Sequence, residues 1–264
     1  MVTPKKPLLT PELAQRLQRA LSAESDELFA LVQEPHPEVL TTLLKNPAFE
    51  EPHLLALLKR RDLNEELLRA IYQSEAGKSH NVRRALARHP LTPGPVVLAI
   101  LPHLYLFELL DITLLPGMTP DQRFAAERQI IQRLPTTELG NRMALARRAG
   151  STIVGELFKT GERQVFEICL TSPHLKEVAI LQYLNGPRAD AETISLIARH
   201  PRWKNRPNLR LAILKNHRTP SIWFTLFLPR LNVGEVRNLL ISRRLTPPQH
   251  QLVKDELRRR GLAR

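Results

Sequence analysis

The sequence predicts an all-α protein, built as an α-solenoid of stacked helical hairpins. Two observations support this fold class. An apolar pattern with helical spacing recurs along the chain, and prolines mark the points where these helices would end and begin. Patterns typical of β-strands are nearly absent. The clearest copy of the repeat runs from Val82 to Pro93.

In each copy, mostly apolar residues lie three, four, five and eight positions before a closing residue; the polar exceptions are Thr42, Asn141 and Thr193. For the copy that closes at Pro90, they are Ala87, Leu86, Ala85 and Val82. This spacing puts the apolar side chains on one side of an α-helix. The other closing residues are Pro47, Ala149, Pro173, Pro201 and His217. Six copies in the same register indicate internal repetition.

Proline also predicts the helix boundaries. It cannot continue a helix and disfavours the α conformation in the residue before it, so we expect helices to end at Asn46, His89 and His200. Asparagine, and histidine to a lesser degree, can take the left-handed conformation common at helix ends. Threonine followed by proline should start a helix, because threonine caps it and proline fills its first position. These pairs are Thr10-Pro11, Thr92-Pro93, Thr119-Pro120, Thr219-Pro220 and Thr246-Pro247.

A second apolar stripe follows most closing residues, so that each repeat is predicted to be a helical hairpin. The second stripes lie within 54–58, 96–101, 153–158, 178–184 and 222–227. One hairpin has too little surface to bury a core alone and must stack on its neighbours. The closing residues are 43, 59, 24, 28 and 16 residues apart, which predicts an irregular superhelix.

The run from Val82 to Pro93 resembles the leucine-rich repeat variant motif, in which a helix ends in Asn-Pro and Thr-Pro follows. The segment from Leu209 to Pro220 is a second near match. The resemblance implies a HEAT-like solenoid of short helices. This chain departs from the motif, because histidine replaces asparagine at positions 89 and 200. The iron–sulfur cysteine cluster of some family members has no counterpart in the sequence.

We expect a single solenoid domain over residues 1–264, with a divergent N-terminal cap over 8–35, repeats over 36–244 and a basic C-terminal cap over 245–264. The single cysteine, Cys169, occupies a repeat core position and is predicted to be a small buried hydrophobe. It also favours a reducing compartment. Residues 1–7 lack a secretory pattern, and charged residues interrupt the most apolar window, 96–115. These observations predict a cytoplasmic protein without a membrane span.

Charge is distributed unevenly along the chain. The formal net charge is +13, and it divides into −3 over residues 1–75, +5 over 76–150 and +11 over 151–264. Two stretches contain basic residues and no acidic ones: 76–107 and 193–234. Such a basic field attracts acidic surfaces and phosphates. The alternative is a solvated surface in which cations complement helix C-termini.

We therefore predict a binding surface for an anionic partner. Its candidate residues are Arg83, Arg84, Arg88, Arg199, Arg202, Trp203, Lys204, Arg206, Arg210, Lys215 and Arg218. On a nucleic acid, the arginines would contact phosphates and Trp203 could stack on a base. The competing interpretation is that Trp203 fills the seam between two repeats.

The sequence favours a non-catalytic binding or scaffold module for an acidic protein partner. A nucleic-acid binder without strong sequence preference is the first alternative. The second is a HEAT-like DNA glycosylase, which would need a carboxylate beside aromatic residues, as near Tyr105, Phe107, Glu108 and Asp111. No histidine pair has the spacing of a helical zinc site, and no glycine-rich phosphate loop is present. We expect neither a metal nor a cofactor.

Overall fold

The computed structural model describes residues 10–262, and all regular structure in that range is helical: 18 α-helices and four short 3-10 helices, without a strand. The predicted all-α class is confirmed. The segment 1–7, residues 8 and 9 of the predicted N-terminal cap and residues 263 and 264 of the C-terminal cap lie outside the described residues. The helices form two compact units, unit 1 up to Ile130 and unit 2 from Ile131, and each is described by itself. A single domain over the whole chain stays a prediction.

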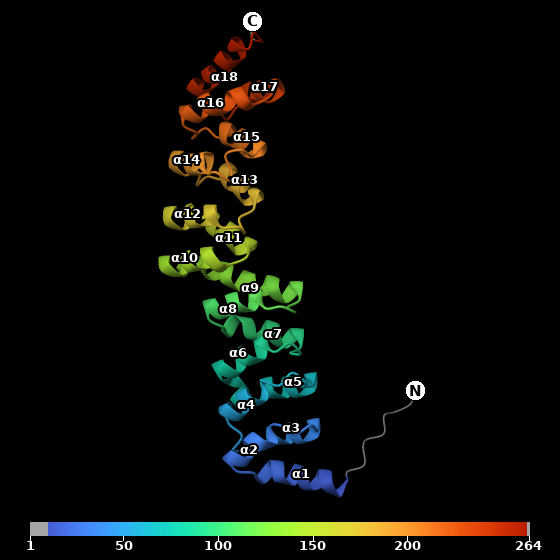
Figure 1. The fold of residues 1–264 in the computed structure, drawn as a ribbon. Coiled ribbons are helices and arrows are strands. Elements are labelled where there is room, and N and C mark those ends of the chain that lie inside the picture. Colours follow the sequence, from blue (N-terminus) through green and yellow to red (C-terminus); the bar gives the residue numbers. More distant parts are fainter. Residues whose placement is uncertain (1–9, 263–264) are drawn as a thin grey trace, which may run out of the picture. The chain divides into compact units, whose positions relative to one another are not determined.

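Unit 1 holds the helices from α1 to most of α9 (Figure 1). They are α1 (Pro11–Ser22), α2 (Ser25–Leu31), α3 (Pro37–Leu43), α4 (Glu51–Leu57), α5 (Glu65–Gln73), η1 (Ala76–Lys78), α6 (His80–Arg88), α7 (Gly94–Ile100), η2 (Leu101–His103), α8 (Leu106–Leu114) and α9 (Pro120–Arg133). The apolar window 96–115 thus folds as two helices, α7 and α8, joined by η2.

Unit 2 continues the helical pattern to the end of α18. Its helices are η3 (Leu134–Thr136), α10 (Leu139–Arg148), α11 (Ser151–Lys159), α12 (Arg163–Thr171), α13 (Glu177–Asn185), α14 (Ala191–Arg199), α15 (Pro207–Lys215), α16 (Ser221–Phe227), η4 (Leu228–Arg230), α17 (Val233–Ile241) and α18 (Pro247–Arg259).

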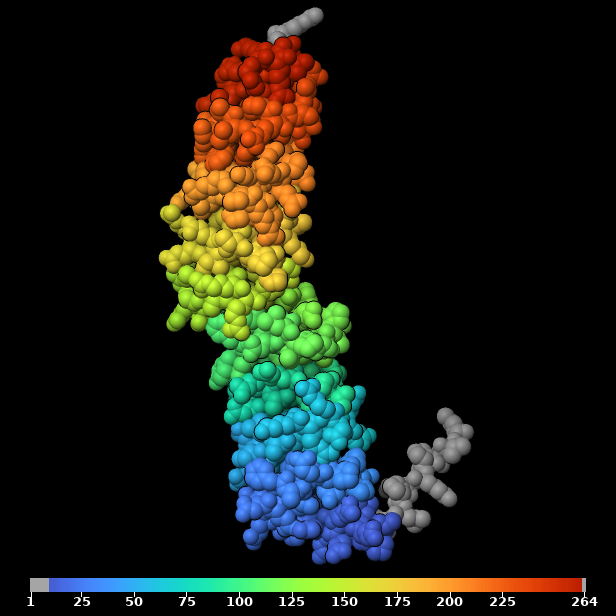
Figure 2. Space-filling model, viewed as in Figure 1, coloured from blue at the N-terminus to red at the C-terminus, as the bar shows by residue number. Residues whose placement is uncertain are grey.

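Within each unit, most helices pack on the helix two places further along the chain. In unit 1, α1 contacts α3, α3 contacts α5, α2 contacts α4, and α4 and α8 both contact α6. In unit 2, α11, α13, α15 and α17 contact one another in that order, as do α10, α12 and α14. Each unit is therefore a series of hairpins that follow one another as layers (Figure 2).

Equivalent helices are spaced more evenly along the chain than the closing residues suggest. In unit 1, the helices α2, α4, α6 and α8 begin at residues 25, 51, 80 and 106, and in unit 2, α11, α13, α15 and α17 begin at 151, 177, 207 and 233. Equivalent helices thus start 26 to 30 residues apart. The closing residues are spaced unevenly because they follow different helices of the hairpins. In unit 1, Pro47 follows α3 and Pro90 follows α6, and in unit 2, Pro201 follows α14 and His217 follows α15.

A polar residue at or just after the end of a repeat helix makes two kinds of hydrogen bond; Asn46 was predicted to end a helix but lies three residues after Leu43, the last residue of α3. At Asn46, the side-chain oxygen accepts from the backbone N–H of Ala48 (2.8 Å), and the amide donates to the carbonyl of Ala23 in the preceding hairpin (3.0 Å). Asn216 repeats this arrangement: its oxygen accepts from Arg218 N–H (2.9 Å), and its amide donates to Leu184 O (2.7 Å).

His89 does the same with its ring. Nδ1 accepts from Leu91 N–H (3.3 Å), and Nε2 lies 2.7 Å from the carbonyl oxygen of Arg60. This pattern assigns the proton to Nε2. Histidine therefore replaces asparagine at this position because both side chains offer one acceptor and one donor.

The prediction of a left-handed conformation at these helix ends is wrong. Over residues 10–262, all residues with a positive φ are glycines. His89 and His200 are extended, with φ and ψ of −78° and 127° and of −66° and 127°. The following proline favours this conformation, and the side chain closes the turn that a left-handed residue would otherwise make.

All five Thr-Pro pairs lie at the start of a helix as predicted, and at three of them threonine caps it. Thr10, Thr119 and Thr246 accept a hydrogen bond from the backbone three residues on, at Leu13, Gln122 and Gln249. After Thr92 and Thr219 the helices α7 and α16 also begin, but proline is the N-cap, so only the predicted capping by threonine is wrong there. These hydroxyls instead donate back to the carbonyls of Leu86 and Ile213, so they close the preceding helix.

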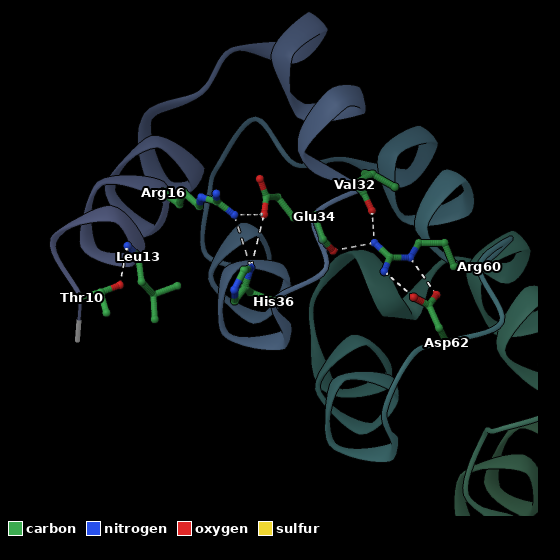
Figure 3. A network of polar contacts seen from close by, with 8 residues as sticks. All are labelled: Thr10, Leu13, Arg16, Val32, Glu34, His36, Arg60 and Asp62. Carbon is green, nitrogen blue, oxygen red and sulfur yellow. Dashed lines mark hydrogen bonds and ion pairs between the residues drawn. The ribbon is translucent and has the colours of Figure 1, made fainter. Parts of the chain in front are cut away.

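Arginine provides a second set of links between consecutive hairpins. Arg60, after α4, donates through one terminal nitrogen to the carbonyls of Val32 (2.6 Å) and Glu34 (2.8 Å), while Asp62 holds the other side of its guanidinium (Figure 3). Arg260, after α18, reaches Leu231 O (2.9 Å) in the same way. The planar guanidinium suits this role because its several donors diverge in one plane.

The repeat stripes form the interior. Val82, Leu86 and Ala87 are buried, as are Cys169 and its neighbours. Burial raises the pKa of the Cys169 thiol to about 12, so the prediction of a small buried hydrophobe is confirmed. Val178 and Ile222, the first residues of two predicted stripes, are exposed instead, since they lie in the first turns of α13 and α16.

The substitution Arg60→Ala should lower the free energy of unfolding by about 2–3 kcal/mol, because it removes charge-assisted hydrogen bonds to two backbone carbonyls. Arg60→Lys should restore less than half of the loss, since an ammonium cannot span the same acceptors. Urea unfolding followed by circular dichroism measures both. The neighbouring Arg61→Ala is the control and should change stability by less than about 0.5 kcal/mol. An equal loss in both alanine variants would contradict the role assigned to Arg60.

Candidate functional site

The best-defined hollow in unit 1 is a basic groove of about 630 Å³. We call it the unit 1 groove. It is lined by Leu55, Leu58, Lys59, Arg61, Asn81, Arg84, Ala85, Ala87, Arg88, His89, Pro90, Thr92, Val97, Leu115, Pro116, Gly117, Met118 and Gln122. Four of these residues are lysine or arginine, and the lining contains neither aspartate nor glutamate.

Two pairs of cations reach the unit 1 groove from adjacent layers. Arg84 and Arg88 are four residues apart on α6 and therefore share one face of that helix. Lys59 and Arg61 lie in the turn after α4, on which α6 packs. The hydrogen bond from His89 to the carbonyl of Arg60 fixes that turn against the end of α6.

The four cations differ in how far they are neutralised. Arg84 lies 3.5 Å from a carboxylate oxygen of Glu108, and Arg88 lies 3.9 Å from Asp111, with both acids on α8. Lys59 and Arg61 are exposed, and neither has an ion pair within the described part of the chain. The positive charge of the groove is therefore strongest at the turn after α4.

Apolar side chains share the unit 1 groove with these cations. Leu55 and Leu58 come from α4 and its end, Val97 from α7, and Leu115 and Met118 from the turn before α9. A ligand that fits here needs negative charge for the cations and some apolar surface for these side chains.

The carboxylates considered for a glycosylase, Glu108 and Asp111, take part in local contacts. Glu108 accepts from Tyr105 N–H (2.9 Å) and lies 2.9 Å from His80 Nε2. Burial raises the pKa of Glu108, but the Tyr105 N–H, His80 and Arg84 outweigh burial and hold it below its usual value. Glu108 is thus an ionised acceptor that caps α8, and Tyr105 beside it is 67% exposed.

The residues selected from the sequence do not gather at one place. Arg83, Arg84 and Arg88 belong to unit 1 and the other eight to unit 2. Arg83 is half-buried, and its Nε has no hydrogen-bond partner among the described residues. Lys59 and Arg61 were not among the predicted residues, because acidic residues surround them along the chain.

Trp203 lies in the interior, so the suggested stacking of its ring on a base is wrong and the competing interpretation describes its position. The side chain is 3% exposed, and its indole N–H donates to the carbonyl of Leu170 (3.2 Å). It fills the seam between two hairpins. The guanidinium carbon of Arg202 lies 4.3 Å from the centre of this ring.

Several of the predicted arginines in unit 2 also make internal contacts. Arg202 donates to Ser172 O (2.7 Å), and Arg218 donates to Ala189 O (2.8 Å), each reaching back one hairpin. Arg210 donates to Lys204 O (2.8 Å). Burial and the nearby Arg230 lower the pKa of Arg210.

Arg202 and Arg218 are nonetheless exposed, and the remaining predicted cations of unit 2 also lie at the surface. Arg206 is 4.0 Å from a carboxylate oxygen of Glu177. Arg199 and Lys204 are exposed. Lys215 is half-exposed and lines a second hollow, which lies in unit 2.

No family model, curated protein or solved structure matches this chain. Between residues 10 and 262, there is no cluster of three or more metal-ligating side chains. Over the same residues, none of the helices combines the length and apolar character needed to cross a membrane.

Protonation of His89 should destabilise unit 1. Burial lowers the pKa of His89, with a smaller contribution from Arg61, whereas the hydrogen bond to Arg60 O opposes the shift. Because the folded pKa lies below the unfolded value of about 6.5, the stabilisation is complete above that pH. It is lost as the pH falls from about 6.5 through the folded pKa.

His89→Asn should keep both hydrogen bonds, as at Asn46 and Asn216, and should remove part of the acid sensitivity. His89→Ala should instead cost about 1–3 kcal/mol at pH 8, where histidine is neutral. Thermal unfolding between pH 8 and pH 5 compares the variants. A pH dependence in His89→Asn as steep as in the wild type would show that His89 does not carry the effect.

Proposed function

We propose that this chain is a non-catalytic binding module and that its unit 1 groove holds an acidic, partly apolar segment of a partner protein. The observation behind this proposal is the combination of four cations, no acid and several apolar side chains in one lining. Electrostatic attraction would speed and orient association, and apolar contact would supply affinity.

The repeat architecture supports a binding role. Hairpins stacked in chain order expose a row of helix faces and turns, which α-solenoids of the HEAT-like and leucine-rich variant kinds use to bind partners. We propose that the chain belongs with these solenoids. The buried, unpaired Cys169 supports a reducing, cytoplasmic location.

Three observations favour a protein partner over a nucleic acid. The unit 1 groove is partly apolar, which a phosphate backbone does not need. Trp203 is buried and has no free face for a base. Arg202 and Arg218 donate to backbone carbonyls within unit 2. The glycosylase alternative is not favoured, because the contacts of Glu108 point to a capping role for this carboxylate.

The proposal predicts that a fluorescein-labelled peptide alternating glutamate and leucine binds the full chain more tightly than one alternating glutamate and serine. Fluorescence anisotropy measures both. The double substitution of Lys59 and Arg61 by glutamate should weaken binding of the first peptide about tenfold or more at low salt, because it reverses the least neutralised charges of the groove.

The matched control is Lys45→Glu, which changes an exposed lysine of unit 1 outside the groove. It should leave affinity nearly unchanged. If a single-stranded oligonucleotide bound more tightly than either peptide and lost affinity in the double variant, the groove would belong to the nucleic-acid alternative. Failure of both peptides to bind at low salt would remove the proposal.

A further inference from the structure

A second hollow lies in unit 2, at the C-terminal ends of three stacked helices. Its volume is about 640 Å³. We call it the unit 2 edge site. It is lined by Asn185, Lys215, Asn238, Ile241, Ser242, Arg243 and Arg244. All but Ile241 carry a hydrogen-bond donor in their side chain, and three are cations.

The stacking of α13, α15 and α17 brings these residues together. Asn185, Lys215 and Ile241 are the last residues of the three helices, which pack in that order. Arg244 spans the group, since its guanidinium lies 3.4 Å from the side-chain oxygen of Asn185, two hairpins earlier. The site therefore depends on the repeat and does not form within one helix.

The positive charge at this edge exceeds what the helix ends require. Each helix C-terminus carries a partial charge of about −0.5, so three ends amount to roughly −1.5. Lys215, Arg243 and Arg244 supply three full positive charges in the lining. The flanking turns are 186–190, 216–220 and 242–246. They add two further positive charges, Arg188 and Arg218, and contain one acidic residue, Asp190, which caps α14. A net positive field remains.

Ile241 gives the unit 2 edge site an apolar contact. Its side chain is 78% exposed, the highest value among the exposed large hydrophobic residues of the described chain. Among the lining residues of the site, none is aromatic. The lining can therefore hold an anion and an aliphatic neighbour, but it has no platform on which a nucleic-acid base could stack.

We propose that the unit 2 edge site binds a phosphorylated side chain of a partner protein, with an apolar residue of the partner next to Ile241. A phosphate offers several acceptor oxygens and nearly two negative charges, which match donors that converge from three helices. A carboxylate would use fewer of these donors. This inference does not depend on the unit 1 groove, because its residues all lie in unit 2.

The test uses the full chain, immobilised, and two peptide pools with randomised flanks, one with a central phosphoserine and one with serine. The phosphorylated pool should be retained about tenfold or more over the other, since charge-assisted hydrogen bonds are each worth a factor of this order. Sequencing of the retained peptides should show apolar residues enriched beside the phosphoserine. Arg243→Glu should abolish the preference.

The matched control is Arg237→Glu, an exposed arginine of α17 outside the lining, which changes the net charge equally. It should retain the preference, and circular dichroism should give both variants the wild-type unfolding temperature. Equal retention of the two pools would overturn the proposal. An equal loss of the preference in both variants would also overturn it. A third contrary result would be that a single-stranded oligouridylate displaces the phosphopeptides and that its binding depends on Arg243 more strongly than theirs.

Discussion

The stack depends on polar side chains that donate hydrogen bonds from one hairpin to backbone carbonyls of the hairpin before it. The carbonyls at the end of a helix and in the turn after it have no partner within that helix, and burying them between layers would be costly. Asn46, His89 and Asn216 satisfy them from the end of the next equivalent helix. Arg60 and its counterparts satisfy them from the following turn. Apolar packing holds the layers together, and these bonds fix their register.

The helices could be predicted from the sequence because apolar spacing and proline act locally. The pattern before Pro90 identified a buried stripe correctly, and threonine at 10, 119 and 246 marked true helix starts. The even repeat could not be seen in the same way. Both helices of a hairpin can end in a similar sequence, so the closing residues after α3 and α6 looked equivalent although they belong to different positions.

The sites were harder to predict, because long-range contacts decide which charges are available. The search for stretches without acidic residues identified Arg84 and Arg88, which do line the unit 1 groove. The same rule missed Lys59 and Arg61, whose neighbour along the chain is Asp62, although Asp62 bonds to Arg60. It also selected Arg202, which donates to carbonyls one hairpin back. Charge counted along the sequence cannot separate a cation whose donors are all free from one that also donates to the layer before it.

The links between hairpins have a direction. In each case described, the donor lies on the later hairpin and the carbonyl on the earlier one. A ribosome releases the chain from its N-terminus, and repeat proteins propagate order from one unit to the next. Each newly emerged hairpin therefore meets acceptors that are already in place. The polypeptide can build its layers while it is being synthesised, without waiting for residues still to come.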